Sequence, residues 1–184
     1  MAKVNFQELQ KAGEGDHPLP ELVALLAEPL NPSAEFVQGA VEHGLARHTG
    51  IDPNPSEDYV TGEFPVFFIR FAGRLLQAKF MPLPYFDEKC RPFVNGEPES
   101  LLREFRGREL KAAVKEHQAW ISIALMNANE QPEDAYTFVG GMLSALIIVA
   151  EPLAVIWPEK NRIRAWDYDM LEPLETGNLQ LLFE

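Results

Sequence analysis

The chain has 184 residues, 46% of them hydrophobic, which suits a single domain with a substantial core and argues against global disorder. Its 16 basic and 28 acidic residues give a net charge of −12, which would repel a phosphate backbone and excludes nucleic acid as the expected partner. Cys90 is the single cysteine, so no internal disulfide forms, and the first residues lack a signal-peptide core. No apolar run approaches the ~20 residues that cross a bilayer. We therefore expect a cytoplasmic protein without a membrane segment.

The first fifty residues predict a helical segment. A capping-box-like start at Asn5 opens a helix that Gly13 ends. Pro20 then opens a short helix over 21–28, because proline suits the first helical turn and Pro29 stops it. A third helix is predicted over 33–48, where apolar residues recur at helical spacing.

Residues 51–63 hold two prolines and four acids, which predicts an acidic linker or loop. The strongest hairpin pattern follows at 64–80. Apolar residues alternate with polar ones on both sides of a turn at Ala72-Gly73, as in an antiparallel sheet covered on one face.

The second half predicts two helices and three strands. A helix over 101–117, bent near Gly107, precedes a strand over 118–126 that is apolar on both faces and therefore central in the sheet. Pro132 begins a long helix over 132–150, in which Gly140-Gly141 indicates close approach to the sheet. Strands are predicted over 153–157 and 162–166, and the apolar tail over 178–184 is expected to dock.

This order of elements predicts an α+β fold. We expect an antiparallel or mixed sheet with two helices packed on one face, plus an N-terminal helical segment. The corresponding organisation is a helical segment over 1–50, the acidic linker or loop over 51–63, and an α+β domain over 64–184.

Part of this pattern resembles a bacterial domain family of unknown function. The shared features are His117 and Ala119 at the start of an apolar strand, the long helix over 132–150, and Val155-Ile156-Trp157 at the end of a strand. The hairpin over 64–80 is compatible with the family. The resemblance implies no catalytic residues, and it leaves the acidic N-terminal part and the proline-rich stretch over 81–98 unexplained.

The sequence predicts neither a metal site nor a cofactor. The four histidines, His17, His43, His48 and His117, have no metal-binding spacing. His43 and His48 are five residues apart, about 140° around an α-helix, so they are expected to face apart. Asp167 and Asp169 could hold a cation together with Glu172, although acids near a chain end are more often simply solvated.

Enzymatic activity is the alternative reading. Cys90 and His117 could pair as nucleophile and base, or His117 could act with acids that folding brings close, as in a hydrolase. Cys90 lies in a charged stretch without the glycines or helix start that lower a thiol pKa. Gly140-Gly141 lies inside a helix, so it is no phosphate-binding loop, and the Gly-x-Ser-x-Gly pattern is absent.

Most aromatic residues fall on predicted core positions. Phe93 and Trp166 lie in polar surroundings, so we expect them to be exposed anchors at an interface. A third reading is a small-molecule sensor, which would show a large cavity lined by Trp120 and Phe138.

The expected function is non-catalytic protein binding to a basic partner. Its most specific form is an immunity protein that covers the active site of a basic toxin, because an acidic surface speeds encounter with a basic protein. The oligomeric state stays open. The expected contact residues are Asp52, Glu57, Asp58, Tyr59 and Glu63 in the acidic stretch, with Phe93 and Trp166 as aromatic anchors.

Overall fold

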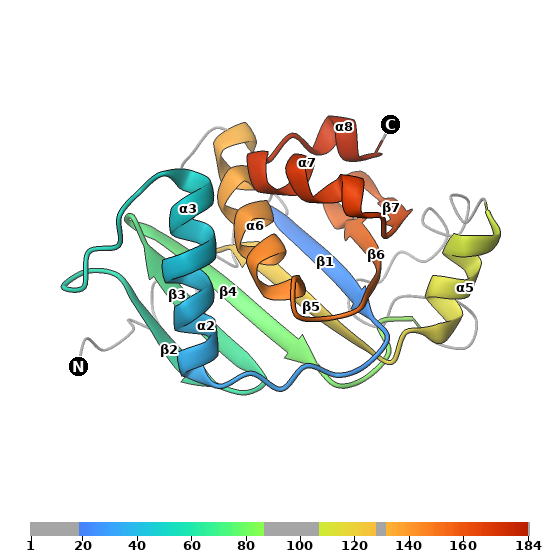
Figure 1. Ribbon diagram of the computed structural model, residues 1–184, viewed down its shortest axis with the longest axis horizontal. Helices are drawn as coiled ribbons and strands as arrows, with labels where there is room; N and C mark the ends of the chain where they lie inside the picture. The colour runs from blue at the N-terminus through green and yellow to red at the C-terminus, as the bar shows by residue number, and fades with distance from the viewer. Residues whose placement is uncertain (1–18, 87–106, 128–131, 184) are drawn as a thin grey trace.

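The computed structural model describes residues 19–86, 107–127 and 132–183, and it has an α+β architecture (Figure 1). Seven antiparallel strands form one sheet in the order β2-β3-β4-β5-β1-β6-β7. The strands are β1 (Glu21–Leu26), β2 (Tyr59–Glu63), β3 (Val66–Phe71), β4 (Arg74–Met81), β5 (Ala119–Leu125), β6 (Pro152–Trp157) and β7 (Arg162–Ala165). The fold class and the antiparallel sheet are thus as the sequence predicts.

The centre of the sheet is formed by β5 and β1. Every residue of β5 is buried, which confirms the central strand predicted over 118–126. The helix predicted over 21–28 is wrong, because β1 is a strand between β5 and β6 with all but its first residue buried. A short apolar run between prolines suits a buried strand and a buried helix equally, so periodicity alone cannot separate them.

The predicted hairpin is confirmed as β3 and β4. Ala72 and Gly73 form its turn with φ of 51° and 77°, the left-handed values that tight hairpin turns require. Side chains alternate between the faces, and those at Phe67, Ile69 and Phe71 are buried. β2 occupies the last part of the predicted acidic loop and adds an edge strand beside β3.

One face of the sheet carries a helical rod of three consecutive pieces, α2 (Ala34–Ala40), the π-helical turn η1 (Val41–Leu45) and α3 (Ala46–Thr49) (Figure 1). Ser33 caps its start by accepting a hydrogen bond from the Phe36 N–H at 3.3 Å. Gly50 ends it with a left-handed φ of 68°. The helix predicted over 33–48 is therefore confirmed.

The same face is covered by α6 (Pro132–Ile147), which lies over β5 and β1, and by the C-terminal elements (Figure 1). A Cβ added to Gly140 would lie 2.2 Å from the backbone oxygen of Leu174 in α7 (Leu171–Thr176). The close approach predicted for this glycine therefore exists, but α7, not the sheet, makes it. The tail docks as expected, with Leu179 and Leu182 of α8 (Leu179–Phe183) buried.

The opposite face carries α5 (Arg108–Glu116), which packs beside β6 and β7, so α5 and α6 lie on different sides of the sheet. Two helices do pack on one face, as predicted. They are α6 and the rod over 34–49, whereas the sequence suggested the helix over 101–117 and α6. The second core, between α5 and the sheet, includes Val23, Leu25, Tyr85, Phe86, Leu110, Val114, Trp120 and Ile156.

Trp120 belongs to this second core, whereas Phe138 of α6 belongs to the first. The sheet separates these two residues, so the sensor cavity expected between them does not form.

Two short 3-10 turns, η2 (Pro158–Lys160) and η3 (Tyr168–Met170), complete the described elements. None of the helices in the described ranges is long and apolar enough to cross a bilayer. The predicted helix over 5–13 and the first part of the one over 101–117 lie outside the described residues.

Candidate functional site

The acidic loop before β2 is held in place by Asp58. This carboxylate is only 9% exposed, and each of its oxygens accepts a backbone hydrogen bond. Oδ2 accepts from the Asn54 N–H at 2.7 Å, and Oδ1 accepts from the Ala72 N–H at 2.9 Å. Asp58 was expected among the surface contact residues, but its carboxylate joins the loop to the β3–β4 turn.

The other acids of this region face solvent. Asp52 and Glu57 are exposed on the fixed loop, and Glu63 is exposed at the far end of β2. Tyr59, at the start of β2, is half-buried and points to the same side as Glu63 because strand side chains alternate. We call Asp52, Glu57, Tyr59 and Glu63 the acidic rim, which follows the edge strand of the described sheet.

Of the two expected aromatic anchors, Phe93 lies outside the described residues. Trp166 is half-buried, since its side chain packs against the first core. Its backbone N–H donates to the Leu153 oxygen at 2.9 Å. The most exposed aromatic beside it is Tyr168, at 80%. Tyr168 lies between Asp167 and Asp169, and such a polar setting in the sequence is the feature that could have indicated its exposure.

His117, the candidate base, is buried beside Tyr85 and Phe86, which follow β4. Its Nε2 accepts hydrogen bonds from the Tyr85 N–H at 2.9 Å and the Phe86 N–H at 3.3 Å. This acceptor role places the proton on Nδ1, which donates to the Val114 oxygen at 2.6 Å. Burial lowers the pKa of His117, so the ring is neutral and both of its nitrogens are engaged in structural hydrogen bonds. Cys90 lies outside the described residues.

The acids at the start of η3 have a local structural role. Asp167 caps this turn, and its Oδ1 accepts from the Asp169 N–H at 3.4 Å. Across the described ranges, no three histidine, cysteine, aspartate or glutamate side chains are placed to hold a metal ion.

A hollow of about 700 Å³ lies between the α2–η1–α3 rod and α6, with α7 at one end. We call it the helix groove. Its functional side chains are Phe36, His43, Arg47, His48, Ser144 and Glu175. The sequence did not single it out, because its walls come from three segments far apart in the chain.

Both histidines of the rod line the groove, and a π-helical turn lies in the segment that carries them. A π-helix closes i→i+5 hydrogen bonds, so residues five apart come onto one side where an α-helix would separate them. The turn spans Val41–Leu45, and both His43 and His48 line the groove. The sequence predicted that they face apart, whereas both border the same hollow, which is wide enough to reach two neighbouring stripes of the rod.

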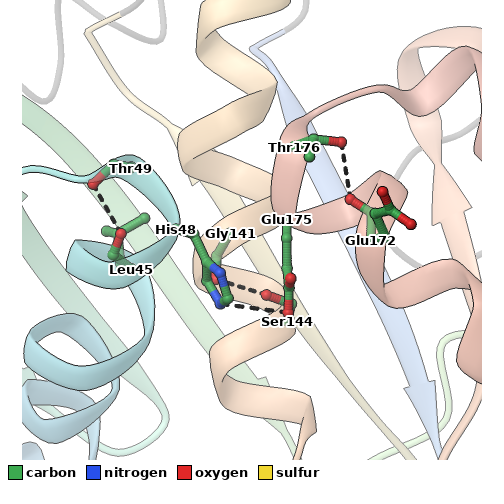
Figure 2. Close-up of polar contacts among 8 residues, drawn as sticks. All are labelled: Leu45, His48, Thr49, Gly141, Ser144, Glu172, Glu175 and Thr176. Carbon is green, nitrogen blue, oxygen red and sulfur yellow. Dashed lines mark hydrogen bonds and ion pairs between the residues drawn. The ribbon is translucent and has the colours of Figure 1, made fainter.

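His48 meets Glu175 of α7 at this groove, and Ser144 of α6 lies nearby (Figure 2). His48 Nε2 lies 3.6 Å from Glu175 Oε1 and ties α3 to α7. The buried Ser144 hydroxyl donates to the Gly141 oxygen one turn earlier, at 2.9 Å. Its proton is thus directed into its own helix and away from His48, which gives Ser144 a structural role.

A second hollow, of about 650 Å³, lies where α6 meets η2 and the tail. Trp157 Nε1 donates to the Tyr136 hydroxyl at 2.8 Å, and this hydroxyl donates to Glu159 Oε2 at 2.6 Å. Burial and the bond to Glu159 raise the pKa of Tyr136. The Nζ of Lys160 lies 3.1 Å from the other Glu159 oxygen, so Trp157, Tyr136, Glu159 and Lys160 form one connected polar chain.

Comparison with known proteins adds no relative: no family model, curated protein or solved structure matches this chain. The resemblance of residues 117–157 to a bacterial domain family therefore stays a prediction. Function has to be argued from the acidic rim and the two hollows.

Proposed function

We propose that the protein binds another protein through the acidic rim, and that this partner is basic. The observation that carries the proposal is the double hydrogen bond of Asp58, which fixes the loop bearing Asp52 and Glu57. Charges on a fixed loop lose little conformational freedom on binding, so their attraction for a partner is not offset by ordering the loop.

The charge of the whole chain supports the same partner class. At −12, the protein attracts basic proteins over a range of about 10 Å at moderate ionic strength. The exposed Phe64, 38% accessible, follows Glu63 directly and offers apolar contact area beside the acids. Exposed acids with an aromatic side chain beside one of them make a surface that a basic partner complements.

The most specific form of the proposal is an immunity protein in the cytoplasm. It would neutralise a basic toxin, such as a nuclease, by covering the toxin's positively charged active site. Electrostatic complementarity would favour rapid capture before the toxin reaches its substrate.

The proposal is tested by affinity capture from the native host at low and high salt. The rim variant carries Asp52→Asn, Glu57→Gln and Glu63→Gln. Wild type should retain a basic protein at low salt and lose it at high salt, and the rim variant should retain at least tenfold less of it.

The matched control carries Glu109→Gln, Glu116→Gln and Glu151→Gln, three exposed acids away from the rim. Its net charge changes by the same amount, so general electrostatic attraction is equal in both variants. Equal capture by the rim variant and this control would contradict the proposal, as would the absence of any salt-sensitive basic protein.

A further inference from the structure

We propose that the hollow between α6, η2 and the α7–α8 connection is a binding site for an aliphatic diamine. We call it the tail hollow. It is separate from the acidic rim, because η2 joins β6 and β7 at the edge of the sheet opposite β2. Its volume of about 650 Å³ lies within the range of small-molecule sites. Its walls combine two carboxylates with a buried aromatic surface, and both kinds of group attract ammonium ions.

The charged side chains of the tail hollow favour a cation. They are Asp134, Glu159 and Lys160, so two carboxylates face one ammonium group and the lining has a net charge of −1. The whole chain carries −12, so the surrounding field has the same sign. An anionic ligand would be repelled by the lining and by the rest of the protein, whereas a cation is attracted by both.

Lys160 shows how the tail hollow receives an ammonium group. Its Nζ lies 3.1 Å from Glu159 Oε1 and 6.0 Å from the centre of the Trp157 ring. The first contact is an ion pair, and the second is at the outer limit of a cation–π contact. The Lys160 side chain is 51% exposed, and exposed ion pairs contribute little stability. A ligand ammonium group can therefore take this place while Lys160 turns to solvent.

The carboxylate of Glu159 is held in position for such a ligand. The Tyr136 hydroxyl accepts from Trp157 Nε1 at 2.8 Å and donates to Glu159 Oε2 at 2.6 Å, and both rings are almost fully buried. Burial opposes ionisation of Glu159, but the hydrogen bond from Tyr136 and the contact with Lys160 outweigh it and lower its pKa. Glu159 is therefore charged and fixed, so it loses little conformational freedom on binding.

The second ammonium group of the ligand is assigned to Asp134. This residue lines the tail hollow from the first turn of α6, and its carboxylate has no hydrogen bond or ion pair in the described ranges. Asn178 and Gln180 also line the hollow, and their amide oxygens can accept further N–H bonds. When Lys160 turns away, two carboxylates remain, and two ligand ammonium groups balance them. A monoamine would leave one carboxylate unpaired.

The test is calorimetric titration of the full chain with diaminobutane, diaminohexane, hexylamine and hexanediol at one salt concentration. The better diamine should bind about fivefold or more tightly than hexylamine, because it forms a second ion pair. Hexanediol, which has the same length without charge, should bind more weakly than either amine. Hexylamine or hexanediol binding as tightly as the better diamine would overturn the assignment, and so would the absence of diamine binding.

Two double variants place the binding in the tail hollow. Asp134→Asn with Glu159→Gln removes both carboxylates but keeps an oxygen that can accept from Tyr136, and it should weaken diamine binding about tenfold or more. Glu109→Gln with Glu116→Gln changes the net charge equally on α5, across the sheet, and should leave the affinity unchanged. Circular dichroism and thermal melting verify that both variants fold. Equal affinity of the two folded variants would contradict the site.

Removing Lys160 tests the site in the opposite direction. Lys160→Gln removes the internal ammonium group and should tighten diamine binding about twofold to fivefold, because the ligand no longer has to displace it. Lys115→Gln, at an exposed lysine on α5, changes the net charge equally and should have a smaller effect. A gain in affinity that is no larger for Lys160→Gln than for Lys115→Gln would contradict the proposed mode of binding.

The indole N–H signals in a proton–nitrogen NMR spectrum locate the ligand without any substitution. The signal of Trp157 should shift on addition of the diamine, because this N–H belongs to the hydrogen-bonded chain that reaches Glu159. The indole of Trp120 lies in the second core, on the other face of the sheet, and its signal should stay in place. Saturation with diamine that moves the Trp157 signal no more than the Trp120 signal would overturn the proposal.

Discussion

Asp58 and His117 show how single buried polar side chains fix the connections of this fold. Asp58 joins the acidic loop to a turn 14 residues later, and His117 joins its own helix end to backbone 31 and 32 residues earlier. Helix caps such as Ser33 and Gly50 could be predicted because their partners are local in sequence. The partners of Asp58 and His117 could not, because they are set by the pairing of strands.

Replacing Asp58 with alanine should destabilise the protein by about 2–3 kcal/mol, since two backbone N–H groups lose a charged acceptor. Chemical denaturation of the variant measures this directly. Asp52→Ala, on the same loop but exposed, should change the free energy of unfolding by less than about 0.5 kcal/mol. Similar losses in the two variants would mean that Asp58 does not hold the loop.

His117 should make stability depend on pH. Burial lowers its pKa below the ordinary 6.5, so the folded state favours the neutral ring. Its contribution to stability is complete above the unfolded pKa and is lost as pH falls below 6.5 toward the folded pKa.

The measurement is the free energy of unfolding between pH 7.5 and 5. Wild type should lose more stability over this range than His117→Phe. A slope that His117→Phe leaves unchanged would show that this ring does not titrate with folding.

At the level of elements, the periodicity of apolar residues and the capping residues were sufficient to predict three elements from the sequence. These are the β3–β4 hairpin, the rod over 34–49 and α6. They failed at β1, where burial on both faces removes the periodic signal. They also failed at the π-helical turn, which no residue pattern announces.

Two helical glycines should respond to alanine with opposite signs. Gly39 has open space around an added Cβ, so Gly39→Ala should stabilise the protein by about 0.5–1 kcal/mol through helix propensity. Gly140→Ala would place the Cβ 2.2 Å from the Leu174 oxygen and should destabilise by about 1–3 kcal/mol. Thermal melting compares both variants with wild type. Equal changes in the melting temperature of Gly39→Ala and Gly140→Ala would contradict the close contact between α6 and α7.

Across the whole molecule, one sheet separates two hydrophobic cores, and the acids gather on solvent-facing positions such as those of the acidic rim. Composition predicted an acidic protein with a substantial core, and the order of the predicted elements added the α+β class. It could not separate Asp58, which builds the loop, from Asp52 and Glu57, which remain free to face a partner.

The central proposal, binding through the acidic rim, is tested most directly by the association rate with the captured partner across a series of salt concentrations. For wild type, the rate should fall steeply as salt rises, because rim charges act mainly on the encounter. The rim variant should start lower and depend less on salt, while dissociation changes little. Identical association rates for wild type and the rim variant at every salt concentration would contradict the account.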